Sequence, residues 1–397
     1  MRGKSATAIV PPKTDVPNMA RTLPQQQLSV IDSRWDGVLN RIAALTKEEK
    51  VEICGLSNVE GALFLAQPGE LNTGTLNATL AEAAGALIRR DKPRDIALGL
   101  YVQLNQVDWD AKEIEGSSYK PCKEGSDCRR NESTDTSQRM KAAATVPLVK
   151  LALAGNDPSV YATAVYACNG ARTGSCASIS YGGWAKIEPD NGAVWLMLAK
   201  EAAARKDIAA RDAALQRAAA SAGFDARMPA FLTVFEVDAV KAQSPLVQSL
   251  IGITLTGLNA AAAIPQAGAL GSLCLRVEAM DEARKSLCDK LANKMLATDD
   301  SVLGLIVPTA VGENIGWDAA RIQALRDERA VATGLVFDMT FDKNVWSCEN
   351  LAKSNQWIQN SLSKGERAIA REYIAASGET LSELAKKYRG TYPSLIR

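Results

Sequence analysis

Apolar residues recur at spacings of three and four along most of the chain, which is the period of helices that bury one face. Segments such as AVWLMLAKEAAARKD and DAALQRAAASAG show this period, whereas sustained alternation of the strand type is almost missing. Glycine and proline separate runs of about a dozen residues, a normal length for globular helices. The pattern predicts an all-α fold, in which antiparallel helical hairpins stack into a partly repeat-like array.

Capping boxes mark three of the predicted helix starts. In a capping box, a Ser or Thr accepts a hydrogen bond from a backbone N–H three residues on, and a Glu there reaches back. The boxes are Thr46–Glu49, Ser363–Glu366 and Thr380–Glu383. The first predicts a helix from Lys47 to Leu65, and the last two predict a final helical hairpin.

The longest uncharged run covers residues 242–275 and is long enough to cross a bilayer. Glutamines, glycines and two prolines interrupt it, which is unusual for a membrane span. We therefore predict no transmembrane segment, and two buried helices joined near Ile264–Pro265.

The chain divides into four parts by composition. Residues 1–27 are polar and contain prolines, as in a flexible tether; residues 28–116 form a first helical block with Trp35; residues 117–139 are a polar loop; residues 140–397 form the main helical domain.

Two successive units of 34 residues, 158–191 and 192–225, lie within the main helical domain. They resemble the tetratricopeptide repeat, a family of stacked helix-turn-helix units. The resemblance implies that the positions carrying the pattern pack between helices, and that the array binds a protein or peptide. These positions are Tyr161, Ala177, Tyr181, Trp184, Pro189, Trp195, Leu198, Leu215 and Ala218.

Eight cysteines are present, and six of them form neighbouring couples that are not CxxC motifs. Wider gaps favour disulfides over thiolate metal or redox sites. The expected pairs are Cys122–Cys128, Cys168–Cys176 and Cys274–Cys288, while the partners of Cys54 and Cys348 stay open. Disulfides indicate an oxidising compartment such as the bacterial periplasm or cell envelope, with a signal or anchor upstream of this chain. Reduced cysteines in a cytoplasmic protein are the alternative.

Candidate chemistry is restricted because the chain has no histidine. Histidine-based nucleophile relays and histidine-ligated metal sites are excluded. Phosphate-binding glycine loops are missing, and a net charge of +1 gives no pull towards nucleic acid. We expect no cofactor, no metal site, no nucleic-acid partner and no assigned catalytic residue. The remaining option is a carboxylate such as Glu236, whose pKa burial would raise.

The sequence thus favours a non-enzymatic helical scaffold or binding protein of the periplasm or envelope, with a protein or peptide ligand. One alternative is an envelope protein that processes or binds glycans through a buried glutamate. Another is a structural component of an assembly, whose mark would be large apolar faces and homo-oligomers.

Overall fold

The computed structural model describes residues 50–54, 56–60, 73–116, 145–168, 174–275, 280–340 and 347–391. These residues are helical apart from connecting loops and one two-stranded hairpin, so the all-α prediction is confirmed. The predicted tether 1–27 and the polar loop 117–139 lie outside the described residues.

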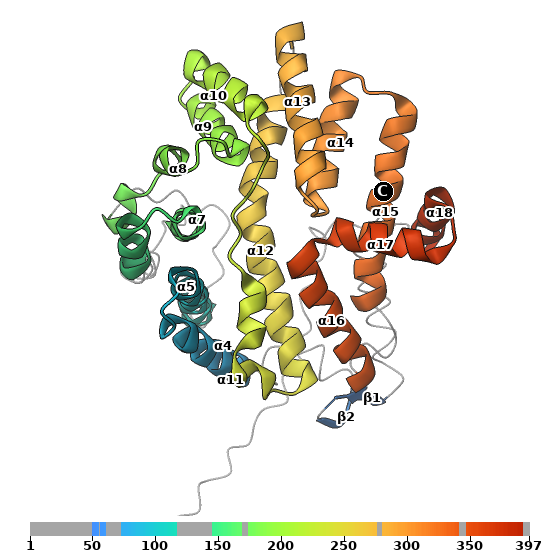
Figure 1. Ribbon diagram of the computed structural model, residues 1–397. Helices are drawn as coiled ribbons and strands as arrows, with labels where there is room; N and C mark the ends of the chain where they lie inside the picture. Colours follow the sequence, from blue (N-terminus) through green and yellow to red (C-terminus); the bar gives the residue numbers. More distant parts are fainter. Residues whose placement is uncertain are drawn as a thin grey trace, which may run out of the picture.

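Figure 1 shows the order of the helices along the chain. In chain order they are α4 (Thr73–Ile88), α5 (Pro93–Gly116), the helix Thr145–Ala154, α7 (Pro158–Cys168), η1 (Gly174–Ser178), α8 (Tyr181–Ile187), α9 (Gly192–Ala204), α10 (Ile208–Ala220), η2 (Phe231–Glu236), α11 (Asp238–Lys241), α12 (Pro245–Cys274), α13 (Glu282–Thr298), α14 (Leu303–Ile315), α15 (Ala319–Thr340), α16 (Cys348–Lys364), α17 (Glu366–Ser377) and α18 (Leu381–Thr391).

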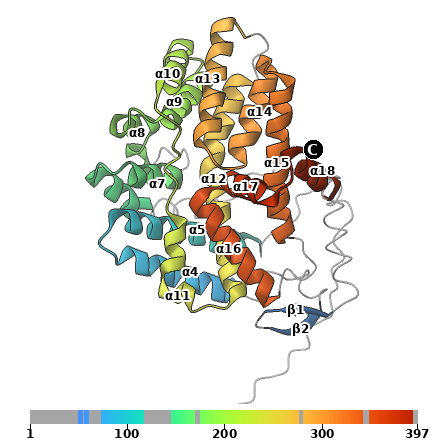
Figure 2. The ribbon, with the colours of Figure 1, turned by 45° about the vertical axis from the view of Figure 1, so that its right-hand side comes forward.

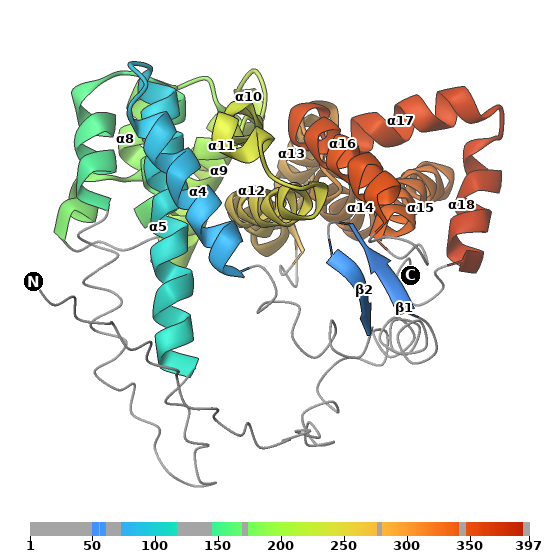
Figure 3. The same ribbon diagram turned by 90° about the horizontal axis from the view of Figure 1, so that it is seen from below.

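Helix α12 stands in the middle of the molecule, with α4 to α10 on one side and α14 to α18 on the other (Figures 1 and 3). It is a single helix through Pro265, so the prediction of two helices joined at this proline is wrong. Proline removes one backbone hydrogen bond from a helix. Packing offsets that loss, since one half of α12 buries Ile251 and Leu255 and the other buries Leu270 and Leu273.

Four hydrophobic clusters form the core, and α12 connects two of them. Its first half packs with α4, α5, η2 and α16, and its second half packs with α9, α10, α13 and α14. The first helical block therefore shares its core with the C-terminal helices. Among the described residues, α12 is also the one helix long and apolar enough to cross a membrane.

The C-terminal helices pack on α12 through α16, which lies alongside its first half, while α17 leads across to α15 (Figure 2). Cluster four joins α15, α17 and α18. The capping box at Thr380 is confirmed, because Glu383 N–H donates to Thr380 Oγ1 at 3.3 Å and Thr380 N–H donates to Glu383 Oε2 at 2.9 Å.

The prediction of a capping box at Ser363–Glu366 is wrong, because Ser363 lies inside α16 and Gly365 precedes α17. Gly365 has φ +85°, and a Cβ there would lie 2.5 Å from the carbonyl oxygen of Asp300. Only glycine fits both conditions easily. The chain therefore turns at Gly365 rather than at Ser363.

The helix predicted from Lys47 to Leu65 is also wrong. Residues Lys50–Ile53 (β1) and Leu56–Glu60 (β2) form an antiparallel hairpin, in which Val51 faces Val59. Their β-branched side chains favour strands over helices. The hairpin is joined to the start of α16 by the Cys54–Cys348 disulfide. The capping box at Thr46 lies outside the described residues.

Candidate functional site

A groove with a volume of about 850 Å³ lies between the α8–α10 side of the molecule and the C-terminal helices. Six segments line it: the start of α7 at Ser159, the turn after α8, residues 222–228 after α10, the middle of α12, the end of α13 with residues 299–301 after it, and the end of α16 with Gly365. This size falls in the range of protein ligand sites, about 300–1,000 Å³.

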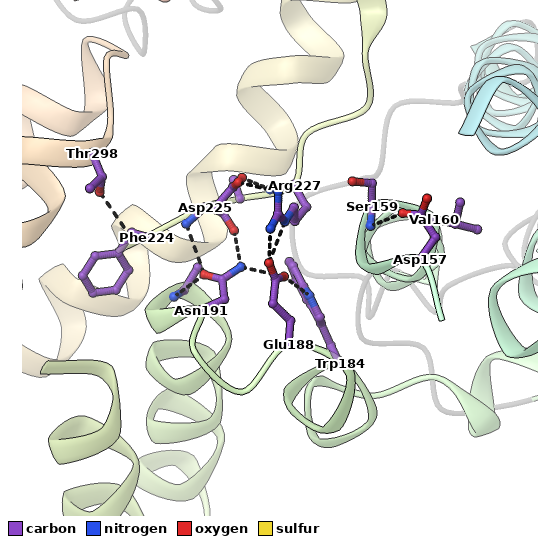
Figure 4. Close-up of polar contacts among 12 residues, drawn as sticks. Asp157, Ser159, Val160, Trp184, Glu188, Asn191, Phe224, Asp225, Arg227 and Thr298 are labelled. Carbon is purple, nitrogen blue, oxygen red and sulfur yellow. Dashed lines mark hydrogen bonds and ion pairs between the residues drawn. The ribbon is translucent and has the colours of Figure 1, made fainter. Parts of the chain in front are cut away.

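Asn191 holds the first wall of the groove together (Figure 4). Its side chain is the N-cap of α9, since Oδ1 accepts from Ala193 N–H at 3.0 Å. The same oxygen accepts from Asp225 N–H at 3.1 Å, and Nδ2 donates to the Asp225 carbonyl at 2.7 Å and to Glu188 Oε2 at 3.0 Å. A buried amide with every hydrogen-bonding site used fixes residues 222–228 against the helix start.

Glu188 is the charged centre of this wall. It accepts hydrogen bonds from Trp184 Nε1 at 3.0 Å and from Arg227 Nε at 2.8 Å, in addition to Asn191 (Figure 4). Burial alone would raise the pKa of Glu188, but the hydrogen bonds from Arg227, Asn191 and Trp184 lower it overall. Glu188 is therefore held ionised as the partner of Arg227.

Arg227 also pairs with Asp225, whose Oδ2 lies 2.8 Å from Nη1. The backbone of Arg227 has φ +50°, and the backbone N–H of Arg227 donates to Asp225 Oδ1 at 2.7 Å. The hydrogen bond with Glu188 is the main reason why the pKa of Arg227 is raised. The contacts between Asp225 and Arg227 fix a tight turn in the segment 222–228, and they place the Arg227 guanidinium in the groove wall.

The opposite wall is formed where α13 ends. Thr298 Oγ1 accepts from Phe224 N–H at 3.2 Å, which connects the two walls at one end of the groove (Figure 4). Burial raises the pKa of Asp299, although its Oδ1 accepts from Ser301 N–H at 2.8 Å. Burial, followed by the neighbouring charge of Asp299, also raises the pKa of Glu366.

Acidic side chains outnumber basic ones along the groove. The carboxylates are Glu188, Asp190, Asp225, Asp299 and Asp300, and the cations are Arg227 and Lys364. Arg227 is paired with carboxylates of its own wall, and Arg371 from α17 lies 3.5 Å from Asp300; the five carboxylates of the lining still outnumber these two arginines and Lys364, so the groove presents surplus negative charge. An acidic cleft attracts cationic ligands.

A smaller cavity of about 190 Å³ lies behind the groove, between α5, α7 and α12. Tyr166 lines this cavity, while Gln266 lines the groove; Gln266 Nε2 donates to the Tyr166 hydroxyl at 3.1 Å, and that hydroxyl donates to the carbonyl of Ala226. Burial raises the pKa of Tyr166 well above its usual range. The neutral phenol thus separates the two spaces.

The residues predicted to pack between the helices of the repeat differ in how far they are buried. Buried side chains belong to Tyr161, Trp184, Leu215 and Ala218; half-buried ones to Tyr181, Trp195 and Leu198; exposed ones to Ala177 and Pro189. The second unit is a helical hairpin of α9 and α10, but the first has α7 followed by η1 and the short α8. Trp184 contacts the groove network through Glu188, and Trp195 Nε1 donates to the carbonyl of Pro189, the residue after Glu188, at 2.7 Å.

Two predicted disulfides are present in the structure, Cys168–Cys176 and Cys274–Cys288. The structure also joins Cys54 to Cys348, which the sequence left open. Cys122 and Cys128 lie outside the described residues.

Glu236, the glutamate expected to be buried, is exposed at the end of η2. It lies between the buried Phe235 and Val237, and its side chain points away from the core that they enter. Within the described part of the chain, no group of histidine, cysteine or acidic side chains is arranged to hold a metal ion.

Sequence reasoning did not identify Asn191, Asp225, Arg227 or Asp299. A signal for the first two was present, since Asn191 and Asp225 end the two 34-residue units and are hydrogen-bonded to each other. Comparisons with protein-family models, curated proteins and solved structures find no match to this chain. The tetratricopeptide resemblance therefore stays a prediction.

Proposed function

We propose that this protein is a non-enzymatic binding protein that holds an extended, positively charged peptide segment of a partner in the groove. The observation that carries the proposal is the groove itself, with its surplus of carboxylates and its wall of extended backbone at residues 222–228. A lysine- or arginine-rich segment would meet complementary charge along the cleft.

The groove also offers apolar and neutral polar groups for such a ligand. Phe224, Met228 and Met295 line it together with the side chains of Asn259 and Gln266. Methionines adapt to ligand side chains of different shape, and amides can pair with a peptide backbone. This mixture suits a peptide better than a small anionic metabolite.

The proposed location is the periplasm or cell envelope. Support comes from three cysteine pairs at disulfide distance, Cys54–Cys348, Cys168–Cys176 and Cys274–Cys288, because disulfides persist in oxidising compartments. Mass spectrometry of alkylated, unreduced native protein should find these cysteines unlabelled. Alkylation of all of them would contradict the location.

Binding can be tested by fluorescence anisotropy with a labelled lysine-rich peptide and a neutral peptide of equal length. Asp190 and Asp300 are exposed on the groove, so the variant D190K/D300K should keep the fold and lose about tenfold or more in affinity for the basic peptide, a change of about 1.4 kcal/mol. The matched control E82K/D91K makes the same charge change at exposed positions outside the groove. It should bind as the wild type does; equal losses in both variants would contradict the proposal.

A second candidate function is favoured by Asp299. A carboxyl group with a raised pKa on a groove wall is suited to donate a proton, as a glycan-processing enzyme requires. Incubation with peptidoglycan fragments tests this directly. If the wild type forms product and D299N does not, the protein is a glycan-processing enzyme. If the wild type forms no product, the result excludes this second function and supports the binding function.

A further inference from the structure

The smaller cavity, of about 190 Å³, lies between α5, α7, α12 and the start of α8. We call it the tyrosine cavity, because Tyr101, Tyr166 and Tyr181 line it. An apolar cavity of about 150 Å³ is large enough to hold one benzene molecule. The tyrosine cavity therefore has room for one six-membered ring with a small substituent.

The tyrosine cavity has a buried floor and an opening on the side of α12. Tyr101, Leu104 and Ala262 are buried, and they form the floor. Ala261 is exposed and Pro265 is half-buried, so the cavity meets solvent where these two residues lie. A small molecule can enter there without passing through the groove.

Three phenol groups lie near one another at this cavity. Burial raises the pKa of Tyr166, and the neighbouring phenols of Tyr181 and Tyr101 raise it further. The Tyr166 hydroxyl already donates to the carbonyl of Ala226 and accepts from Gln266 Nε2. It holds the wall towards the groove and is not free for a ligand.

The Tyr181 hydroxyl, in contrast, has no hydrogen-bond partner in the described part of the chain. Burial, followed by the charge of Glu201, raises the pKa of Tyr181 to about 12, so the hydroxyl keeps its proton at neutral pH. A half-buried hydroxyl without a partner gains a hydrogen bond when a ligand brings one. Tyr181 is therefore the polar contact that the cavity offers.

The lining also restricts the charge of a ligand. Among the described residues, no acidic or basic side chain lines the tyrosine cavity. A charged molecule would lose hydration there without meeting an opposite charge, which is costly. Leu104 and Val165 provide apolar contacts instead. The cavity is thus suited to an uncharged ring that carries one hydrogen-bonding group.

We propose that the tyrosine cavity binds one compact, uncharged cyclic alcohol or phenol, whose ring packs on Leu104 and Val165 and whose hydroxyl hydrogen-bonds to Tyr181. This site is separate from the groove, and the proposal does not depend on the ligand of the groove.

Isothermal titration calorimetry of the full chain tests the proposal, with phenol as the probe and benzoate as its charged counterpart. Phenol should bind saturably with one site per chain. Benzoate should bind at least tenfold more weakly, because its carboxylate finds no opposite charge in the cavity.

Two neighbouring positions on α12 provide a matched pair of variants. Ala260 and Ala261 are both exposed, but only Ala261 lines the tyrosine cavity, and Ala260 lines neither the cavity nor the groove. A261W should fill the opening and weaken phenol binding at least tenfold. A260W adds the same side chain beside the opening and should bind phenol as the wild type does.

The variant Y181F tests the hydrogen bond, because it keeps the ring and removes the hydroxyl. It should weaken phenol binding severalfold, the size of one neutral hydrogen bond. Circular dichroism shows whether each variant keeps the fold, and Y181F decides the outcome if A261W does not.

Three results would overturn the proposal. The first is the absence of saturable phenol binding by the wild type. The second is equal phenol binding by the wild type and a folded A261W, because the probe would then occupy another site. The third is benzoate binding as tight as that of phenol, or an unchanged affinity in Y181F, because the cavity would then not select an uncharged hydroxyl compound.

Discussion

Asn191 connects three parts of the molecule through one side chain: the start of α9, the extended segment at Asp225, and the carboxylate of Glu188. It is 4% exposed. Because all of its hydrogen-bonding groups have partners, removal of the amide leaves several buried polar groups unpaired. We regard it as the residue that fixes the shape of the groove.

The variant N191A should lower the free energy of unfolding by about 2–3 kcal/mol, because it combines loss of an N-cap with unpaired buried groups. Asp207 provides a matched control, since it caps α10 by accepting from Ala210 N–H at 3.0 Å at an exposed site. D207A should cost only about 1 kcal/mol. Urea denaturation measures both, and equal losses would mean that the links to Asp225 and Glu188 contribute nothing.

Glu366 predicts a pH effect of defined sign. Burial raises the pKa of its carboxyl group, so the folded state binds this proton more tightly than the unfolded state does. The contribution of Glu366 to stability therefore falls as pH rises from the unfolded value through the raised folded value. E366Q should be more stable than the wild type at neutral pH, and the difference should vanish below about pH 4, under the unfolded value of about 4.3.

Glutamine at position 366 can still accept the hydrogen bond that Val302 N–H donates to Glu366 Oε2. E379Q, at an exposed position, is the control and should follow the wild-type curve of melting temperature against pH. An E366Q curve parallel to that of the wild type would show that Glu366 does not titrate abnormally.

Residue types predicted a contact correctly where the hydrogen-bond partners lie close together in the chain. The pattern at Thr380–Glu383 is a complete capping box because its partners lie within one turn. The roles of Asn191 and Arg227 depend on residues 34 and 39 positions away, which no local rule specifies. The prediction that Glu236 is buried was wrong for a related reason, because burial depends on which side of a short helix meets the core.

Elements were predictable where the helical period is strong, as in α9 and α10. The predicted elements were wrong where another interaction outweighs the helical period of the apolar residues. Packing along both halves of α12 overrides the helix-breaking effect of Pro265. The hairpin β1–β2 replaces a helix in a segment whose β-branched residues and long-range disulfide favour strands.

The disulfides should differ in their contributions to stability. In the chain-entropy model, a crosslink stabilises more when it closes a longer loop. Cys274–Cys288 spans 14 residues, whereas Cys54–Cys348 spans 294. C274A/C288A should lose about 3 kcal/mol and C54A/C348A about 5 kcal/mol. Thermal unfolding under non-reducing conditions gives the order, and a larger loss in C274A/C288A would contradict it.

On the scale of the whole molecule, α12 unites the two sides that form the groove. Its middle residues Asn259, Ala263 and Gln266 line the groove, while its ends are buried in two separate core clusters. The walls are thus carried by helices that pack on a common element. This arrangement supports a preformed site rather than one assembled by the ligand.

Hydrogen exchange with and without the lysine-rich peptide shows whether the groove is the binding site for a basic peptide. On peptide addition, exchange should become slower in residues 222–228 and 298–301, which line opposite walls, and should stay unchanged in α18. Protection confined to other surfaces, or no protection at a saturating peptide concentration, would rule out the groove as the binding site.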